Sequence, residues 1–164
     1  RNTIELAAKK ANWGKAPVGV FQGFSAYFSF NTYVAQVVEV TLEAGQPKIK
    51  RMVCAVDCGV VINPEHAINQ IEGGLVDGLG HAMFSNMTFK DGVPEQTNYD
   101  TYRTIKMGDT PPVEVYFVEN ELDPTGLGEP ALPPLSAALG NAIFKATGIR
   151  LRKQPFSLNG LRNV

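Results

Sequence analysis

The chain has 164 residues, of which 44% are hydrophobic and 19% charged, a composition typical of one globular domain with a real core. The formal net charge is −1, without a basic run or an acidic tail, which argues against a nucleic-acid or membrane-surface partner. No apolar run approaches the length that is needed to cross a bilayer. We therefore expect 1–164 to form a single domain.

The first residues look like an internal part of a longer chain. Apolar residues within 4–11 recur with helical spacing, so a helix begins within a few residues of Arg1. Neither an initiator methionine nor a signal sequence precedes it. We expect the chain to be a fragment, and for that reason the sequence does not indicate a compartment.

Three segments predict an antiparallel sheet. Residues 33–42 and 48–57 are rich in β-forming residues, and the glycine-containing segment 43–47 between them is typical of a hairpin connection. The segment 23–30 is predicted as an earlier strand of the same sheet.

The two cysteines, Cys54 and Cys58, are predicted as core thiols. In an extended segment 49–58, they would lie ~13 Å apart, which is too far for a disulfide bond. Two cysteines also cannot hold an iron–sulfur cluster by themselves, because such clusters need four ligands.

A helix is predicted at 64–82. Asn63 suits the N-cap, Pro64 the first helical position and Glu65 the first turn. The helix also contains Gly73, Gly74, Gly78 and Gly80. Each glycine in a helix costs about 1 kcal/mol relative to alanine, so we expect a compensating role for them.

The helical period divides this segment into two faces. The apolar face, predicted as core, carries Ile68, Ile71, Leu75, Leu79 and Ala82. The opposite face is flat, with Gln70, Gly73, Gly74, Asp77, Gly78 and His81. Such a face either accepts a planar ligand or packs closely on another helix. Gln70 can donate and accept hydrogen bonds there.

The remaining elements are predicted from turn residues and apolar spacing. We expect strands at 84–89 and 113–119, an element of undecided type at 102–107, and a helix at 134–147 that Gly148 ends. The fold class is thus α+β, an antiparallel sheet with packed helices.

One loop, Gly126-Leu127-Gly128-Glu129-Pro130, presents an isolated carboxylate. Pro130 restricts Glu129 to an extended conformation, and the glycines permit a close approach of the backbone to a ligand. A general base is usually displayed in this way. The alternative is a helix-entry loop with a solvated glutamate.

Other kinds of site have no signature in the sequence. Asp77 and His81 are four residues apart but lack further ligands at a zinc-binding spacing, so we expect no metal held by side chains. There is no GxSxG motif, no GxGxxG motif after a strand and no Walker A motif. The glycine-faced helix and the Glu129 loop would suit a bulky, planar, anionic cofactor.

A set of motifs in a fixed order resembles a known family. The motifs are Asp57-Cys58-Gly59, Ile62-Asn63-Pro64, Gln70-Ile71-Glu72-Gly73-Gly74, Gly78-Leu79-Gly80 and Gly126-Leu127-Gly128-Glu129-Pro130. In this order they resemble the molybdenum-binding subunit of the xanthine oxidase family. The likeness is strongest to the beta subunit of isoquinoline 1-oxidoreductase and to aldehyde-dehydrogenase-like relatives, and it extends from about 10 to 158.

The resemblance implies roles for four residues. Glu129 corresponds to the catalytic base, which activates a hydroxyl on molybdenum for attack on an electron-poor carbon of an N-heteroaromatic or aldehyde substrate. Water is the oxygen source, and hydride passes to a sulfido ligand. Gln70 would lie against the pterin or the oxo group, and Gly128 beside the metal centre. Gly74, on the flat face, would adjoin the cofactor.

The resemblance also implies a cofactor and partners. The cofactor is molybdopterin with molybdenum, in the cytosine dinucleotide form, and [2Fe–2S] clusters lie on a small partner subunit. Family subunits are several times longer, so the chain corresponds to the C-terminal part of a molybdopterin-binding domain. We expect it to be inactive without the remainder of the large subunit and prone to self-association. The rivals are a non-catalytic interaction module that kept the fold and an enzyme that uses Glu129 without a metal.

Overall fold

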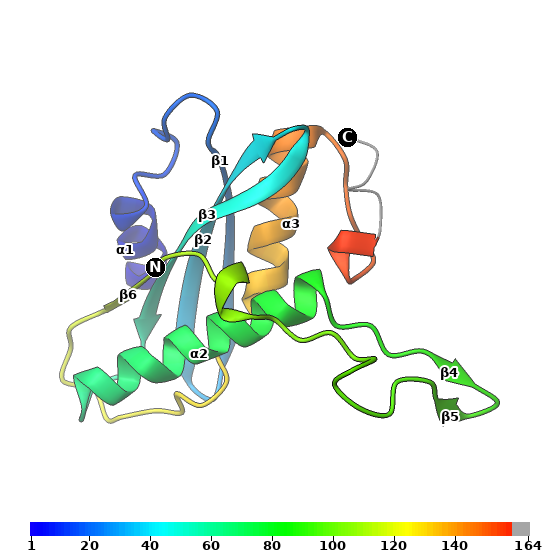
Figure 1. Cartoon of the computed structure of the whole chain (residues 1–164). Coiled ribbons are helices and arrows are strands. Elements are labelled where there is room, and N and C mark those ends of the chain that lie inside the picture. The colour runs from blue at the N-terminus through cyan, green and yellow to red at the C-terminus, as the bar shows by residue number, and fades with distance from the viewer. Residues whose placement is uncertain (159–164) are drawn as a thin grey trace.

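A computed structural model describes residues 1–158 of the chain. Its elements follow one another as α1 (Asn2–Lys10), β1 (Phe21–Ser29), β2 (Thr32–Glu43), β3 (Gln46–Asp57), α2 (Pro64–Met83), β4 (Phe89–Lys90), β5 (Val93–Pro94), η1 (Met107–Asp109), β6 (Val113–Phe117), α3 (Pro133–Thr147) and η2 (Phe156–Leu158) (Figure 1).

The central sheet has the strand order β1-β2-β3-β6. β2 pairs antiparallel with both β1 and β3, which confirms the predicted hairpin and the earlier strand. The expected antiparallel arrangement needs one correction, because β6 runs parallel to β3. The connection between these two strands passes through α2, and such a crossover brings the chain back in the same direction.

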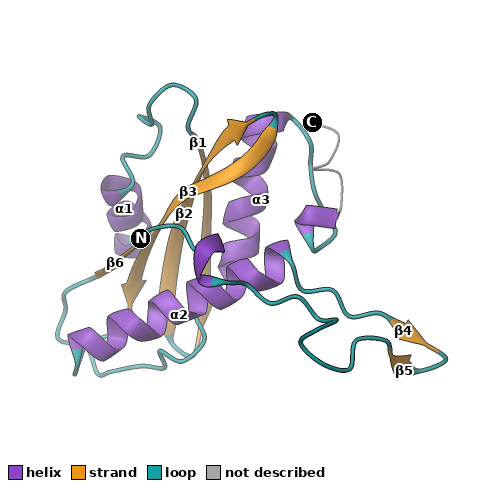
Figure 2. Cartoon of the chain, in the orientation of Figure 1, coloured by secondary structure: helices purple, strands orange, loops and turns teal. Residues whose placement is uncertain are grey.

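Helices cover both faces of the sheet (Figure 2). α2 and α3 pack on one face, and α1 packs on the other, against Ala35 and Ala55. Because both faces are covered, β2 is buried without interruption from Val34 to Val40. The mixed α and β content and the mainly antiparallel sheet confirm the predicted α+β class.

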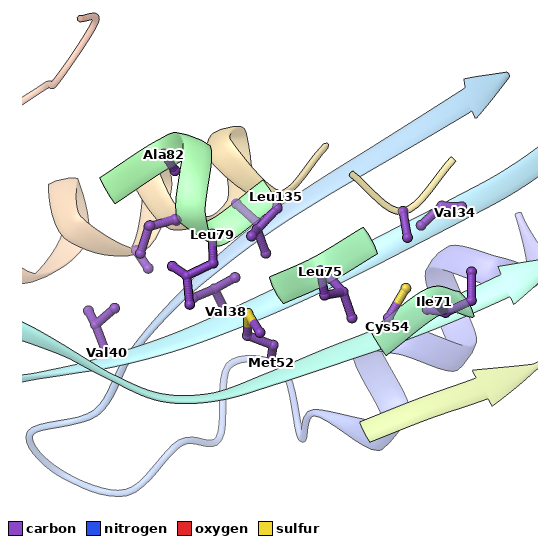
Figure 3. Close-up of a cluster of buried hydrophobic side chains, with 14 of the residues drawn as sticks. Val34, Val38, Val40, Met52, Cys54, Ile71, Leu75, Leu79, Ala82 and Leu135 are labelled. Atoms are coloured by element: carbon purple, nitrogen blue, oxygen red, sulfur yellow. The ribbon is translucent and has the colours of Figure 1, made fainter. Parts of the chain in front are cut away.

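The main core lies between the sheet and the two long helices. Figure 3 shows Ile71, Leu75 and Leu79 of α2 above Met52 and Cys54 of β3. The apolar face predicted for α2 is therefore correct, except that Ile68 is only partly buried.

The start of α2 and the end of α3 follow from local chemistry. The Asn63 side chain accepts a hydrogen bond from the backbone N–H of His66 at 3.1 Å, and Pro64 is the first residue of α2. α3 ends at Gly148, which adopts the left-handed conformation with φ 75°. The helix begins at Pro133, one residue before the predicted boundary.

The strand predicted at 84–89 is wrong. Phe84 caps the end of α2, and only Phe89–Lys90 is extended, paired with Val93–Pro94 in a two-stranded hairpin. Figure 1 shows this hairpin projecting from the rest of the molecule, so the apolar segment has no sheet edge on which to form a longer strand. The segment of undecided type, 102–107, is irregular and leads into η1.

Both cysteines are free and buried, as predicted. Cys54 is 0% exposed, and burial raises the pKa of its thiol to about 12. Burial, and then the neighbouring Asp57 carboxylate, raise the pKa of Cys58. Both thiols are accordingly packing groups, not nucleophiles.

Candidate functional site

The segment that leads from β6 to α3 crosses the β1–β2 turn. The backbone N–H of Gly126 donates to the carbonyl oxygen of Phe30 at 3.1 Å, and that of Thr125 donates to the carbonyl oxygen of Cys58 at 2.9 Å. A side chain at position 126 would place its Cβ 2.6 Å from the Cβ of Phe30. Only glycine permits this close approach.

Three side chains donate hydrogen bonds to carbonyl oxygens on either side of Glu129. Thr32 Oγ1 donates to the Gly126 oxygen at 2.7 Å, and Gln70 Nε2 donates to the Gly128 oxygen at 2.6 Å. Gln36 Nε2 donates to the Ala131 oxygen at 2.6 Å. The loop has no regular secondary structure, but hydrogen bonds from side chains of β2 and α2 fix its backbone.

Glu129 itself is exposed. Its carbonyl oxygen accepts a hydrogen bond from the Leu132 N–H at 3.0 Å, which closes a turn before α3. Among residues 1–158, its carboxylate has no hydrogen-bond or ion-pair partner. None of the described elements covers the loop, so residues 1–158 by themselves leave the Glu129 carboxylate in contact with solvent.

The backbone around Glu129 is open to a ligand. Within the described residues, the N–H groups of Gly128 and Glu129 have no acceptor. A Cβ at Gly128 or at Gly73 would have no other atom within 4 Å. Free amides beside open space attract anionic groups, so these residues fit a phosphate-bearing or otherwise anionic cofactor.

The glycine face of α2 divides into an open part and a packed part. A Cβ at Gly74 would lie 3.3 Å from the Cβ of Ala131, and one at Gly78 would lie 2.8 Å from the Leu132 oxygen. Close packing on the segment that enters α3 therefore explains Gly78, which is buried, so the packing alternative holds at this position. A cofactor contact at Gly74 stays a prediction.

The structure brings Gln70, Gly128 and Glu129 together. The hydrogen bond between Gln70 and Gly128 joins two predicted site residues that are 58 positions apart in the sequence. Asp77 and His81 form only an exposed pair, with 3.6 Å between Oδ1 and Nε2. Across the described residues, no group of three or more His, Cys, Asp or Glu side chains could hold a metal ion.

Two residues of the site were not predicted from the sequence. Thr32 is 0% exposed and Gln36 is 1% exposed, and both lie in β2. Their signal is a polar residue among the core-facing positions of β2, where Val34, Val38 and Val40 are apolar. That signal was available only once the buried face of the strand was known.

The fold and these motifs define a cofactor-binding domain. A family model described as the molybdopterin cofactor-binding domain matches residues 3–111. The chain belongs to this family, and the resemblance to molybdenum-binding subunits of the xanthine oxidase family is confirmed. The family is described as binding the molybdopterin cofactor, and Gln70, Gly128 and the free amides of the loop are the residues of this chain whose chemistry fits such a group.

Two relatives align with nearly the whole chain. The membrane-bound aldehyde dehydrogenase [pyrroloquinoline-quinone] of Gluconacetobacter polyoxogenes is 34% identical, over 98% of this chain and 22% of the relative. The isoquinoline 1-oxidoreductase subunit beta of Brevundimonas diminuta is 30% identical, over 94% of this chain and 20% of the relative. The chain thus spans about a fifth of the length of the relatives it matches.

The crystal structure of quinoline 2-oxidoreductase from Pseudomonas putida 86 has a similar fold. Its TM-score is 0.69 at 21% identity, over 76% of this chain and 17% of that chain. Among the helices in the described part, none is long and apolar enough to span a membrane.

Proposed function

We propose that this chain forms one wall of the active site of a molybdenum-dependent oxidoreductase, with Glu129 as the catalytic base. The observation that carries the proposal is the bond from Gln70 Nε2 to the Gly128 oxygen. It joins the glycine-rich helix to the loop, next to an exposed carboxylate that has no other partner among the described residues.

The bound cofactor supplies the two-electron acceptor for the oxidation. Glu129 accepts, on a carboxylate oxygen, the proton of the water whose oxygen enters the substrate. Gln70 fixes the carbonyl group that precedes Glu129, so that the carboxylate is presented from a defined backbone. The free N–H groups of Gly128 and Glu129 donate to the anionic cofactor.

The substrate class that we propose is an N-heteroaromatic compound or an aldehyde, oxidised at its electron-poor carbon. The names of the relatives support both, because one is an isoquinoline oxidoreductase and another is an aldehyde dehydrogenase. We further propose the cytosine dinucleotide form of molybdopterin and a small partner subunit with [2Fe–2S] clusters.

One relative favours a second cofactor, because its name contains pyrroloquinoline quinone. A carboxylate can serve as general base with either cofactor, so activity alone does not separate the two. Elemental analysis of the full-length protein decides between them. We expect about one molybdenum per chain, whereas a quinone without molybdenum would support the second candidate. Absence of both would support the interaction module.

The substitution Glu129→Gln in the full-length protein tests the role of the base. Gln is nearly isosteric and fits the exposed site, so molybdenum content should stay unchanged. The rate of substrate oxidation per bound molybdenum, with an artificial electron acceptor, should fall at least ~10²-fold because the amide cannot accept a proton.

Glu121→Gln is the matched control. Glu121 lies in the same connection between β6 and α3 and is also exposed, but it is outside the loop. We expect this variant to keep the full rate. A rate within a few-fold of wild type for Glu129→Gln would remove Glu129 from the mechanism.

A further inference from the structure

Two buried polar side chains of β2 contact the loop on opposite sides of Glu129. Thr32 lies at the start of the strand and reaches the Gly126 oxygen, while Gln36 reaches the Ala131 oxygen one residue beyond Pro130. The contact between Gln36 and Ala131 spans 95 positions in the sequence. Neither residue contributes an atom to the exposed surface around Glu129.

We propose that Thr32 and Gln36 are positioning residues that fix the direction of the Glu129 carboxylate. This inference rests on the proposed function, because it assumes that Glu129 is the base. The carboxylate has no side-chain partner among residues 1–158, so its direction depends on the backbone alone. A loop without regular structure keeps such a direction only if other groups hold its peptide units.

Gln36 is an unusual residue for a core position. Within the described residues, its Oε1 has no hydrogen-bond partner, although the side chain is 1% exposed. A buried, unpaired carbonyl group destabilises a fold, so stability alone does not account for a glutamine here. The bond from its Nε2 to the Ala131 oxygen supplies a reason for its presence.

The neighbouring strand reinforces this attachment. Ser25 of β1 lies opposite Gln36 in the sheet, and its Oγ donates to the Pro134 oxygen at 2.8 Å. Ser25 and Gln36 thus form a polar row on the face of the sheet that α2 and α3 cover. The row holds the chain between Ala131 and the first turn of α3.

Thr32 fixes the other end of the loop. It is 0% exposed, and its Oγ1 lies 2.7 Å from the Gly126 oxygen and 2.7 Å from Thr125 Oγ1. The Gly126 N–H donates to the Phe30 oxygen in the adjacent turn. The segment from Gly126 to Ala131 is therefore held by Thr32 at its start, by Gln70 in its middle and by Gln36 at its end.

The chain offers a matched control for Gln36. Gln22 of β1 is also a buried glutamine, 2% exposed, and its Nε2 donates to the Ala11 oxygen at 2.7 Å. It lies on the opposite face of the sheet, toward α1, far in the fold from the loop. Gln36→Leu and Gln22→Leu each remove a buried hydrogen bond from a glutamine to a main-chain carbonyl, and Gln22→Leu also removes the bonds of Gln22 with Glu39 and with the Gly14 N–H.

Both variants are compared in the full-length protein. We expect Gln36→Leu to lower kcat per bound molybdenum ~10–100-fold, because a small misplacement of a reacting group has effects of this size. Molybdenum content and KM should stay within twofold of wild type. Gln22→Leu should lower thermal stability at least as much and leave kcat per molybdenum unchanged.

Amide hydrogen exchange gives a readout that does not need the cofactor. In cofactor-free protein, the hydrogen-bonded amides of Gly126 and Leu132 should exchange faster in Gln36→Leu and at the wild-type rate in Gln22→Leu. Equal exchange and equal kcat per molybdenum in the two variants would overturn the positioning role. Faster exchange combined with a fully active Glu129→Gln enzyme would overturn the proposed function and leave the attachment of the loop intact.

A pair of variants at Thr32 keeps the inference testable if Gln36→Leu does not fold. Thr32→Val removes the hydroxyl at nearly constant volume and should lower kcat per molybdenum at least ~tenfold. Thr32→Ser keeps the hydroxyl and should restore the rate to within a few-fold of wild type. Equal rates for the two variants would contradict a positioning role for this hydroxyl.

Discussion

Glu129 and Glu114 are two carboxylates in opposite settings. Glu129 is exposed and unpaired within the described part of the chain, whereas Glu114 of β6 accepts hydrogen bonds from Arg51 Nη1 and from Tyr116, each at 2.8 Å. Arg51 also binds Glu39 through Nε at 2.8 Å and Nη2 at 3.0 Å. The first carboxylate is free for chemistry, and the second is part of a structural network.

The network around Glu114 predicts a loss of stability in acid. Burial by itself would raise the pKa of Glu114, but the hydrogen bonds from Arg51 and Tyr116 together outweigh it and lower the pKa. The folded-state pKa thus lies below the unfolded value of about 4.3. The resulting stability is present above that value and is lost as the pH falls through the lower folded pKa.

Urea unfolding of the chain between pH 6 and 3 measures this loss. We expect Glu114→Gln to flatten the fall of the unfolding free energy with acid. Glu43→Gln is the control, because Glu43 pairs with Lys48 at 3.0 Å on the surface, where ion pairs contribute little. Identical pH slopes for wild type and Glu114→Gln would contradict the assignment.

Close packing explains how the helices are placed. A Cβ at Gly23 of β1 would lie 2.1 Å from the Ala138 oxygen, so α3 lies directly on the backbone of that strand. Gly78 plays the same part between α2 and the start of α3. At Gly23 and Gly78, the close packing compensates for the free-energy cost of a glycine inside a strand or a helix.

Two glycines of α2 allow a direct test of this explanation. Gly78→Ala should destabilise the chain by about 1–3 kcal/mol, because the new Cβ would lie 2.8 Å from the Leu132 oxygen and the backbone must shift. Gly73→Ala, in open space, should stabilise it by up to about 1 kcal/mol, since alanine favours helix more than glycine.

Urea unfolding of the two variants at one pH gives both values. Wild type and an alanine variant at Gly108, another glycine in open space, calibrate the measurement. Opposite signs for Gly73→Ala and Gly78→Ala are the expected result. A stabilising Gly78→Ala would show that the contact with Leu132 relaxes without cost, and packing would then not explain the glycine.

The whole molecule presents its candidate site on one side only. Gln70, Gly128 and Glu129 are exposed, and the chain spans about a fifth of the length of its relatives. A large cofactor would contact this chain on one side only, and its other side would have no protein contact. Much of its binding affinity would then be missing, while the entropic cost of ordering it would remain.

We therefore expect this chain, purified alone, to contain no stoichiometric molybdenum and to have no oxidoreductase activity. Elemental analysis after expression in a host that makes the cofactor measures this, and the full-length protein serves as the positive control. A molybdenum content near one per chain in the isolated domain would contradict the prediction.

Local signals in the sequence determined most of the elements. The turn at 43–47, the capping residues Asn63 and Gly148 and the apolar stripe of α2 were each predictable. They were predictable because turn and cap chemistry acts within a few residues of the chain. The motifs around Gln70 and Glu129 likewise indicated the family without a structure.

Only the tertiary structure decided how these elements meet. The strand predicted at 84–89 fails because no sheet edge lies beside it, and β6 is parallel to β3 because α2 intervenes. The contact of Gln36 with Ala131 depends on the two segments being folded onto one another across 95 positions. A local pattern carries no information about such a partner, because long-range hydrogen bonds are fixed by which buried surfaces come together in the folded chain.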